Sequence, residues 1–144
     1  MILGIVGHEA SKFNTLAEAR ARMAIRALLR RYKPTLVVSG ACPLGGIDIW
    51  AVEEARKLGV PVREYAPTSH QWAGPGGFQE RNLQIAKADV VACISVTQYI
   101  STYRGRRFPT CYHCKERNPP HVKGGGCWTA WQAKAREFVF IEPS

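Results

Sequence analysis

The sequence has no apolar run close to the roughly 20 residues that a membrane-spanning helix needs, so we expect no membrane partner. Its first residues show neither the basic segment nor the small-residue cleavage site of a secretory signal, and we expect a cytoplasmic protein. Repeats and low-complexity tracts are also absent. A chain of 144 residues without these features is expected to form one domain, 1–144, with a proper core.

Acidic residues are scarce, with 11 Asp and Glu against 20 Lys and Arg, so the net charge is +9. This balance favours anionic partners such as nucleotides, nucleic acid or phosphorylated metabolites. A cationic surface that serves only solubility is the alternative. The excess lies in two groups: Arg20, Arg22, Arg26, Arg30, Arg31 and Lys33, and Arg104, Arg106, Arg107, Lys115, Arg117 and Lys123.

Strand-like and helix-like segments alternate along the chain. Apolar runs predict buried strands at 2–7, 35–39, 60–65, 90–95 and 138–141. Periodic segments predict helices at 15–32, 47–58, 78–87 and 127–136, the first opening on a capping box, Thr15 to Glu18. Buried strands separated by helices predict a Rossmann-like three-layer α/β/α domain with a mainly parallel sheet of about five strands. In such sheets ligands bind beyond the carboxyl ends of the strands.

Three of the five cysteines cluster with two histidines, which favours a metal site over disulfides. The spacing C-x2-C-x6-H-x5-C is typical of a tetrahedral zinc site, and four protein ligands predict a structural ion. The predicted ligands are Cys111, Cys114, His121 and Cys127. His113 is the competing nitrogen ligand, and free thiols in a loop are the alternative. Zinc would order the aperiodic insertion 97–126, which is long for a structureless loop.

Glycine-rich turns follow several predicted strands and lead into helices, where free backbone N–H groups can bind an anion. Asp48 could accept a bond from a ribose hydroxyl, and Arg81 could bind phosphate bidentately. Ordinary turns, and an Arg81 paired with a carboxylate, are the alternatives. Trp128 and Trp131 could stack on a base, but their spacing places at least one in the core. The predicted nucleotide-site residues are Gly7, His8, Ser39, Gly40, Gly45, Gly46, Asp48, Arg81, Asn82, Gly125, Gly126 and Thr129.

These elements resemble the SLOG superfamily, which includes the LOG phosphoribohydrolases and the DNA-processing protein DprA. The resemblance lies in the stretch from Ser39 to Asp48, in Gly74 to Asn82, and in the glycines before Cys127, and it spans nearly the whole chain. It implies a Rossmann-like domain that binds a nucleotide or nucleotide-derived ligand, often as a dimer. Thr129 matches the LOG motif, but Gln132 stands where those enzymes carry a catalytic Glu.

The leading hypothesis is therefore binding of a nucleoside phosphate or an ADP-ribose-like ligand. The first alternative is a hydrolase of N-glycosidic or phosphate bonds, with His8, Asp48 and Glu80 as its acid–base candidates. A DprA-like single-stranded nucleic-acid binder is the further alternative. It would use the arginine stripe of the first helix, formed by Arg22, Arg26 and Arg30 on one face, or the aromatic and basic residues of the insertion. Those aromatic residues are Tyr99, Tyr103, Phe108 and Tyr112.

Overall fold

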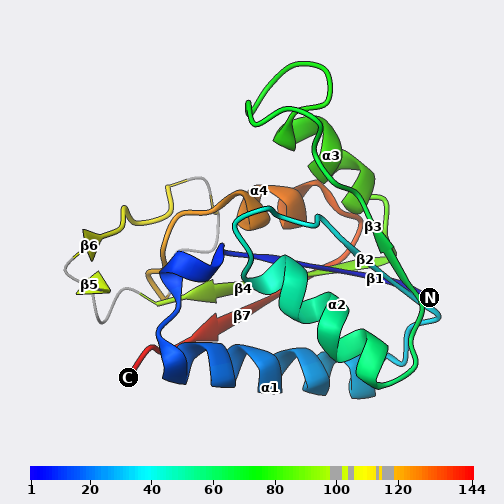
Figure 1. Ribbon diagram of the computed structural model, residues 1–144, viewed down its shortest axis with the longest axis horizontal. Coiled ribbons are helices and arrows are strands. Elements are labelled where there is room, and N and C mark those ends of the chain that lie inside the picture. Colours follow the sequence, from blue (N-terminus) through cyan, green and yellow to red (C-terminus); the bar gives the residue numbers. More distant parts are fainter. Residues whose placement is uncertain (98–101, 104–105, 113, 115–118) are drawn as a thin grey trace.

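The structure, a computed structural model, describes residues 1–97, 102–103, 106–112, 114 and 119–144. Its centre is a five-stranded, all-parallel sheet with the strand order β3-β2-β1-β4-β7 (Figure 1). The predicted α/β class and mainly parallel sheet are confirmed. The strands are β1 (Ile2–Gly7), β2 (Leu36–Ser39), β3 (Val62–Glu64), β4 (Val90–Val96) and β7 (Arg136–Ile141).

Helices cover both faces of this sheet (Figure 1). α1 (Thr15–Tyr32) and α2 (Ile47–Lys57) pack on one face, and α3 (Phe78–Ile85) and α4 (Gly125–Gln132) lie on the other. A short 3-10 helix, η1 (Ala10–Lys12), follows β1. Among the described helices, none is long and apolar enough to cross a membrane.

The cores on the two faces follow from the alternation of side chains along buried strands. In β4, Ala92 and Ile94 pack with α1 and α2, whereas Val91 and Cys93 join the core beneath α4. The same period of two in fully buried strands produces the continuous apolar runs of the sequence.

Strand order reverses between β1 and β4. The chain adds β2 and β3 on one side of β1, then crosses to β4 and β7 on the other. Gly7, the last residue of β1, pairs with Ile94 in β4. In open parallel sheets this kind of junction leaves a crevice at the carboxyl ends of the strands, where ligands usually bind.

The described ends of the insertion attach to this same edge. The Val122 N–H donates to the Val96 carbonyl at 2.9 Å, and the Cys111 N–H donates to the His121 carbonyl at 2.8 Å. A small antiparallel hairpin of β5 (Thr102–Tyr103) and β6 (Arg106–Arg107) lies beyond them (Figure 1). The start of the metal-site segment is thereby tied to the end of β4.

Several element bounds differ from the predictions by a few residues, and two differences at helix ends have a clear physical reason. α1 is capped by Asn14, whose Oδ1 accepts the Ala17 N–H at 2.7 Å, so Thr15 is the first helical residue and not the cap. α4 begins two residues earlier than predicted and ends at Gln132, because the chain then enters β7. The Arg136 guanidinium caps that end by donating to the carbonyls of Ala130 and Ala133.

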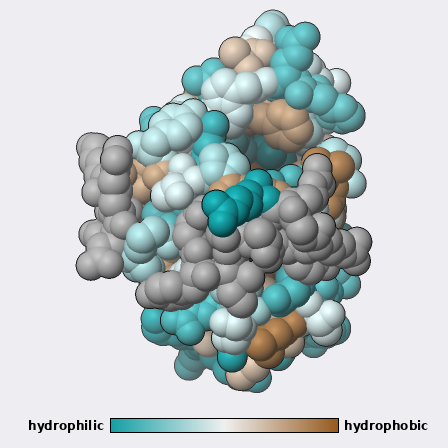
Figure 2. All heavy atoms as spheres, turned by 90° about the vertical axis from the view of Figure 1, so that its left-hand side faces the viewer, coloured by the Kyte–Doolittle hydropathy of each residue, from teal (hydrophilic) through white to brown (hydrophobic). Residues whose placement is uncertain are grey.

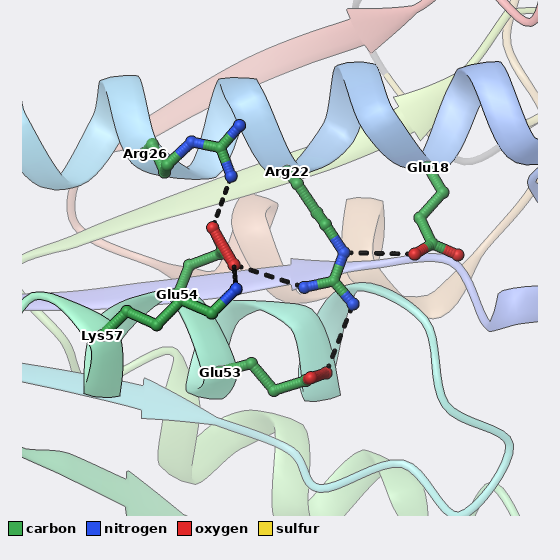
Figure 3. A network of polar contacts seen from close by, with 6 residues as sticks. All are labelled: Glu18, Arg22, Arg26, Glu53, Glu54 and Lys57. Atoms are coloured by element: carbon green, nitrogen blue, oxygen red, sulfur yellow. Dashed lines mark hydrogen bonds and ion pairs between the residues drawn. The ribbon is translucent and has the colours of Figure 1, made fainter.

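The arginine stripe of α1 meets glutamates of α2 (Figure 3). Glu54 has only 1% of its side chain exposed, and it accepts hydrogen bonds from Arg22, Arg26 and Lys57. Arg22 also contacts Glu53 at 3.4 Å. These contacts match part of the stripe's charge inside the fold, which favours a role in helix packing over a free nucleic-acid surface.

We expect Glu54→Gln to lower the free energy of unfolding by about 1–2 kcal/mol, because three cations lose their shared charge partner beside a buried amide. Urea denaturation followed by circular dichroism measures this. Burial raises the pKa of Glu54, but hydrogen bonds from Arg26 and Lys57 outweigh it and leave that pKa below its ordinary 4.5. The wild-type advantage should therefore be present above pH 4.5 and fade as the pH falls below it.

Glu53→Gln is the matched control, because this neighbouring side chain is 45% exposed and makes one long contact. Its effect should stay under about 0.5 kcal/mol. Equal losses in the two variants would contradict a special role for the buried Glu54.

Candidate functional site

The predicted metal ligands are brought together. The ligand atoms of Cys111, Cys114, His121 and Cys127 all lie within 4.8 Å of one another, and all four residues are buried. Ligands on one tetrahedral zinc ion lie roughly 3.5–4 Å apart, given the usual bond lengths. The group could therefore hold a metal ion after a small contraction.

His121 is oriented for such a role. Its Nδ1 lies 3.0 Å from the Pro119 carbonyl, and its Nε2 lies 3.2 Å from the Cys114 Sγ. The carbonyl can only accept, so Nδ1 carries the proton and the Nε2 lone pair faces the sulfur atoms. An outer carbonyl that fixes the tautomer is usual for metal-binding histidines. Among the described residues, His121 supplies the nitrogen atom of this group, and His113 lies outside them.

The sulfur atoms sit in a crowded, buried setting. The Cys127 Sγ is 3.8 Å from the Cys93 Sγ and 3.6 Å from the Ser95 Oγ. The hydrogen bond with Cys93, followed by burial, raises the pKa of Cys127. Burial, followed by the contact with Cys127, raises the pKa of Cys114. Protein groups alone thus disfavour thiolates here, and the charge of a metal ion would supply what they lack.

The metal group is continuous with a glycine-rich helix start. Cys127 lies in the first turn of α4, directly after Gly124, Gly125 and Gly126. A Cβ at Gly126 would lie 3.0 Å from the Gly7 nitrogen, so a side chain there would push α4 and β1 apart by a few tenths of an ångström. The segment that carries a metal ligand therefore also forms one wall of the switch-point crevice.

A cavity of about 280 Å³ lies in this crevice. Figure 2 looks onto this edge of the sheet and shows the surface hollowed beneath the part that holds α3 and the loop before it. The cavity is lined by Val6, Gly7, His8, Glu9, Lys12, Cys42, Leu44, Asp48, Trp72, Phe78, Arg81, Asn82, Ile85, Lys123, Gly124, Gly125, Gly126 and Thr129.

Most of the predicted nucleotide-site residues line this cavity, namely Gly7, His8, Asp48, Arg81, Asn82, Gly125, Gly126 and Thr129. The Thr129 hydroxyl already has a partner within α4, because it donates to the Gly125 carbonyl at 3.0 Å. The structure therefore brings these predicted residues together on one cavity wall, although the Thr129 hydroxyl is already hydrogen-bonded within the fold.

Ser39, Gly40, Gly45 and Gly46 lie behind the lining. The Ser39 hydroxyl donates to the Asp48 carbonyl at 2.7 Å. Gly46 has φ +87°, and a Cβ there would lie 2.3 Å from the His8 carbonyl oxygen. The same carbonyl accepts the Ile47 N–H at 3.1 Å. In this structure the turn places the start of α2 against the end of β1.

Arg81 and Asp48 form a buried polar wall. The Arg81 guanidinium donates to the Gly40 carbonyl and to the Asn82 Oδ1, and it lies 3.7 Å from the Asp48 Oδ2. Burial raises the pKa of Asp48 to about 6, although Arg81 acts against it. Asp48 thus holds its proton more strongly than an ordinary aspartate, in a place where a ligand would reach it.

His8 faces the same space as a neutral group. Burial, helped by the charges of Lys12 and His121, lowers its pKa to about 3. Its side chain is buried against Gly124, and its Nε2 has no hydrogen-bond partner among the described residues. Glu80 is exposed and does not line the cavity, and its carboxylate accepts the Gly76 N–H at 3.2 Å. Of the acid–base candidates, His8 and Asp48 therefore share the pocket.

Sequence reasoning missed several residues of the lining, above all Lys12, Trp72, Phe78 and Lys123. Trp72 lies within the Gly- and Pro-rich loop before α3, and Lys123 directly precedes the glycines of α4. Their nearness to predicted anion-binding turns was the available signal. What brings them together is the packing of α3 beside α4, which the sequence pattern does not specify.

No protein-family model matches the chain, and no significant match was found among curated proteins or solved structures.

Asp48 should make stability fall as pH rises. Its pKa is 3.8 ordinarily and about 6 in the fold, so the folded state binds the extra proton between these values. The stabilisation is full below pH 3.8 and is lost through about pH 6. We expect Asp48→Asn to remove about 2–3 kcal/mol of this pH dependence. Urea unfolding of the wild type and of Asp48→Asn at several pH values between 4 and 7.5 gives, for each protein, the slope of the free energy of unfolding against pH.

The slope is compared, and not the absolute stability, because the asparagine also leaves Arg81 without its counter-charge. Glu80→Gln, at an exposed carboxylate outside the cavity, is the control and should keep the wild-type slope. Identical slopes for Asp48→Asn and the wild type would show that Asp48 titrates normally.

Proposed function

We propose that this protein binds a nucleotide or nucleotide-derived ligand in the crevice between β1 and β4. The observation that carries the proposal is the meeting, at the topological switch point, of a glycine-rich helix start with a lined cavity. This is where doubly wound sheets bind nucleotides. The cavity volume, about 280 Å³, lies near the lower end for small-molecule sites and suits part of such a ligand.

The phosphate groups would lie at the start of α4. The first backbone N–H groups of a helix have no intrahelical partner, and they carry the positive end of its dipole. Lys123 stands directly before this helix and lines the cavity, and no ion pair is recorded for it among the described residues. Lys12 is a weaker candidate, since it pairs with Glu9 at 2.6 Å. Asp48 and Asn82, on the opposite wall, would contact the ribose.

We further propose that the metal ion is zinc and that its role is structural. A set of three thiolates and one imidazole matches the preference of zinc, and four protein ligands leave no open position for a substrate. Zinc would hold the segment before α4 to the helix itself through Cys127. Its contribution would be to fix the glycine wall of the pocket.

A nucleotide hydrolase is the second candidate function. The observation that favours it is the pair of groups in the cavity, a neutral His8 and an Asp48 whose pKa is raised to about 6 by burial. A carboxyl group with a pKa near 6 can exchange a proton close to neutral pH, whereas His8 would stay neutral there and could only hydrogen-bond to the substrate. The SLOG relationship, a dimeric state and nucleic-acid binding stay predictions of the sequence.

The zinc proposal predicts one zinc ion per chain in native mass spectrometry of protein purified without chelators. Cys114→Ser should lose the ion and several kcal/mol of stability. The reason is that the free energy of metal binding, which stabilises the folded state alone, is then lost. Cys42→Ser is the control, since Cys42 lies outside the metal group, and it should keep the zinc. Wild-type protein with intact free thiols and no metal would overturn the proposal.

The ligand proposal predicts thermal stabilisation by a subset of nucleotides. We would screen adenosine and guanosine mono-, di- and triphosphates and ADP-ribose, since a ligand at 100 times its Kd adds about 2.7 kcal/mol. Lys123→Ala should weaken the best ligand about tenfold by removing one phosphate contact. Lys87→Ala, an exposed lysine outside the cavity, should have no effect.

No stabilisation by any of these compounds at millimolar concentration would contradict the proposal. Mass spectrometry of the same mixtures after incubation distinguishes the two candidate functions. Intact nucleotide indicates a binding protein, whereas accumulation of free base or a dephosphorylated product, absent with Asp48→Asn, indicates the hydrolase.

A further inference from the structure

A second cavity, of about 510 Å³, adjoins the first. We call it the aromatic cleft, and it is lined by Trp72, Tyr112, Lys123, Gly124, Gly125 and Trp128. It shares Trp72, Lys123, Gly124 and Gly125 with the main cavity. The start of α4 and the Lys123 side chain therefore stand at the junction of the two spaces.

The aromatic rings of this cleft come from three separate segments. Trp72 lies in the loop before α3, Trp128 lies in α4, and Tyr112 lies between the predicted metal ligands Cys111 and Cys114. The Trp72 and Trp128 rings meet edge to face, with centroids 5.2 Å apart. The Lys123 Nζ lies 4.5 Å above the Tyr112 ring. The cleft thus combines aromatic faces with a cation that stands beside the proposed phosphate site.

These rings are not part of the core. Trp72 is 44% exposed and Tyr112 is 61% exposed, whereas Trp131, one turn along α4 from Trp128, is half-buried and packs with Phe138 against the core beneath that helix. Exposed large aromatic side chains that gather from distant segments mark a binding surface more often than a structural one. Of the two tryptophans of α4, Trp128 therefore lines the cleft and Trp131 packs against the core.

We propose that the aromatic cleft is the base subsite of the ligand pocket, so that the ligand is a nucleoside diphosphate or an ester of one, such as ADP-ribose. This rests on the proposed function. The base would stack among Trp72, Trp128 and Tyr112, and the diphosphate would lie at Lys123 and the start of α4. The remaining sugar or phosphate would occupy the main cavity. Such a ligand has an aromatic ring at one end and anionic groups near its middle, which matches the order of the aromatic cleft, Lys123 and the main cavity.

A mononucleotide fits these observations better than a nucleic-acid strand. Single-strand binders place successive bases on a row of aromatic side chains along a basic groove. Here the described rings surround one cleft, and the space continues from it into the buried wall of Asp48 and Arg81. The second half of a diphosphate ester could end at that wall, whereas a continuing strand would have to turn and leave the cavity elsewhere.

The metal group would also hold the cleft in place. Tyr112 is bracketed by two of the metal ligands, and Lys123, Gly124 and Gly125 lie between the other two, His121 and Cys127. A metal ion bound there fixes the backbone on both sides of the Tyr112–Lys123 pair. The base subsite should therefore be complete only in the metal-loaded protein, which is the form to be tested.

The test is isothermal titration calorimetry of the metal-loaded protein with ADP and with inorganic pyrophosphate. Pyrophosphate carries the anionic part without the base. We expect Trp72→Leu and Tyr112→Leu to weaken ADP binding roughly tenfold or more, because base–aromatic stacking is lost. Both variants should bind pyrophosphate as the wild type does. Trp72→Phe should restore most of the ADP affinity, which a merely structural role of that position would not explain.

Both side chains are largely exposed, so the variants should fold, and near-ultraviolet circular dichroism and the melting temperature check this. Unchanged ADP affinity in both leucine variants, or equal wild-type affinity for ADP and pyrophosphate, overturns the base subsite but leaves the proposed function standing. A wild-type protein that binds neither compound overturns the base subsite, and it overturns the proposed function as well if the nucleotide screen also finds no ligand. Binding of single-stranded oligonucleotides that falls steeply with salt, without ADP binding, replaces both with a nucleic-acid function.

Discussion

The close contact between the start of α4 and the end of β1 is the constraint on which the rest of this site depends. A Cβ at Gly126 would press on the Gly7 backbone and on the Cys93 sulfur, and one at Gly124 would lie 2.6 Å from the His8 Nδ1. With glycine at both positions, the helix can lie directly over the switch point of the sheet. The start of the helix then lies at the crevice, and Cys127 in its first turn lies close to the thiols of Cys111 and Cys114.

The opposite wall is built with polar groups instead of close packing. Arg81 reaches across to the Gly40 carbonyl and stands beside Asp48, while Ser39 holds the Asp48 backbone from below. Buried charges are tolerated only when they are paired and hydrogen-bonded, and here Arg81 has two hydrogen bonds and an ion pair within the fold. The Arg81 charge is therefore already engaged by neighbouring protein groups. That leaves Lys123 as the cation of the lining best placed to meet a ligand's phosphate.

How much of this the sequence predicts depends on the range of the interaction. The alternation of apolar runs and helices predicts the parallel sheet, because each buried strand must be apolar on both faces. The spacing of Cys111, Cys114, His121 and Cys127 predicts their convergence, because the ligands are close along the chain. Partners that lie far apart are not visible in the pattern: the pairing of the α1 arginines with Glu54 depends on how α1 crosses α2.

The same distinction applies to the pocket. Glycine turns after strands lead to the edge of the sheet where the cavity lies, yet Ser39 and Gly46 do not line it. Trp72 does line it, from the glycine-rich loop before α3, although no motif singles that residue out. A turn motif predicts the backbone path but not which of its atoms remain free. That is settled by neighbouring residues: the His8 carbonyl accepts the Ile47 N–H, and the Asp48 carbonyl accepts the Ser39 hydroxyl.

Metal and ligand sites that share a helix start cannot be independent. Cys127 belongs to the predicted metal group, and Gly125 and Gly126, the two residues directly before it, line the cavity. An ion bound to four residues of this segment would remove most of its conformational freedom before a ligand arrives, so the ligand would pay less ordering entropy. Because such coupling is reciprocal, a ligand that occupies the crevice would also hold the metal more tightly. A structural ion in this place would therefore act on affinity through order alone, without touching the ligand.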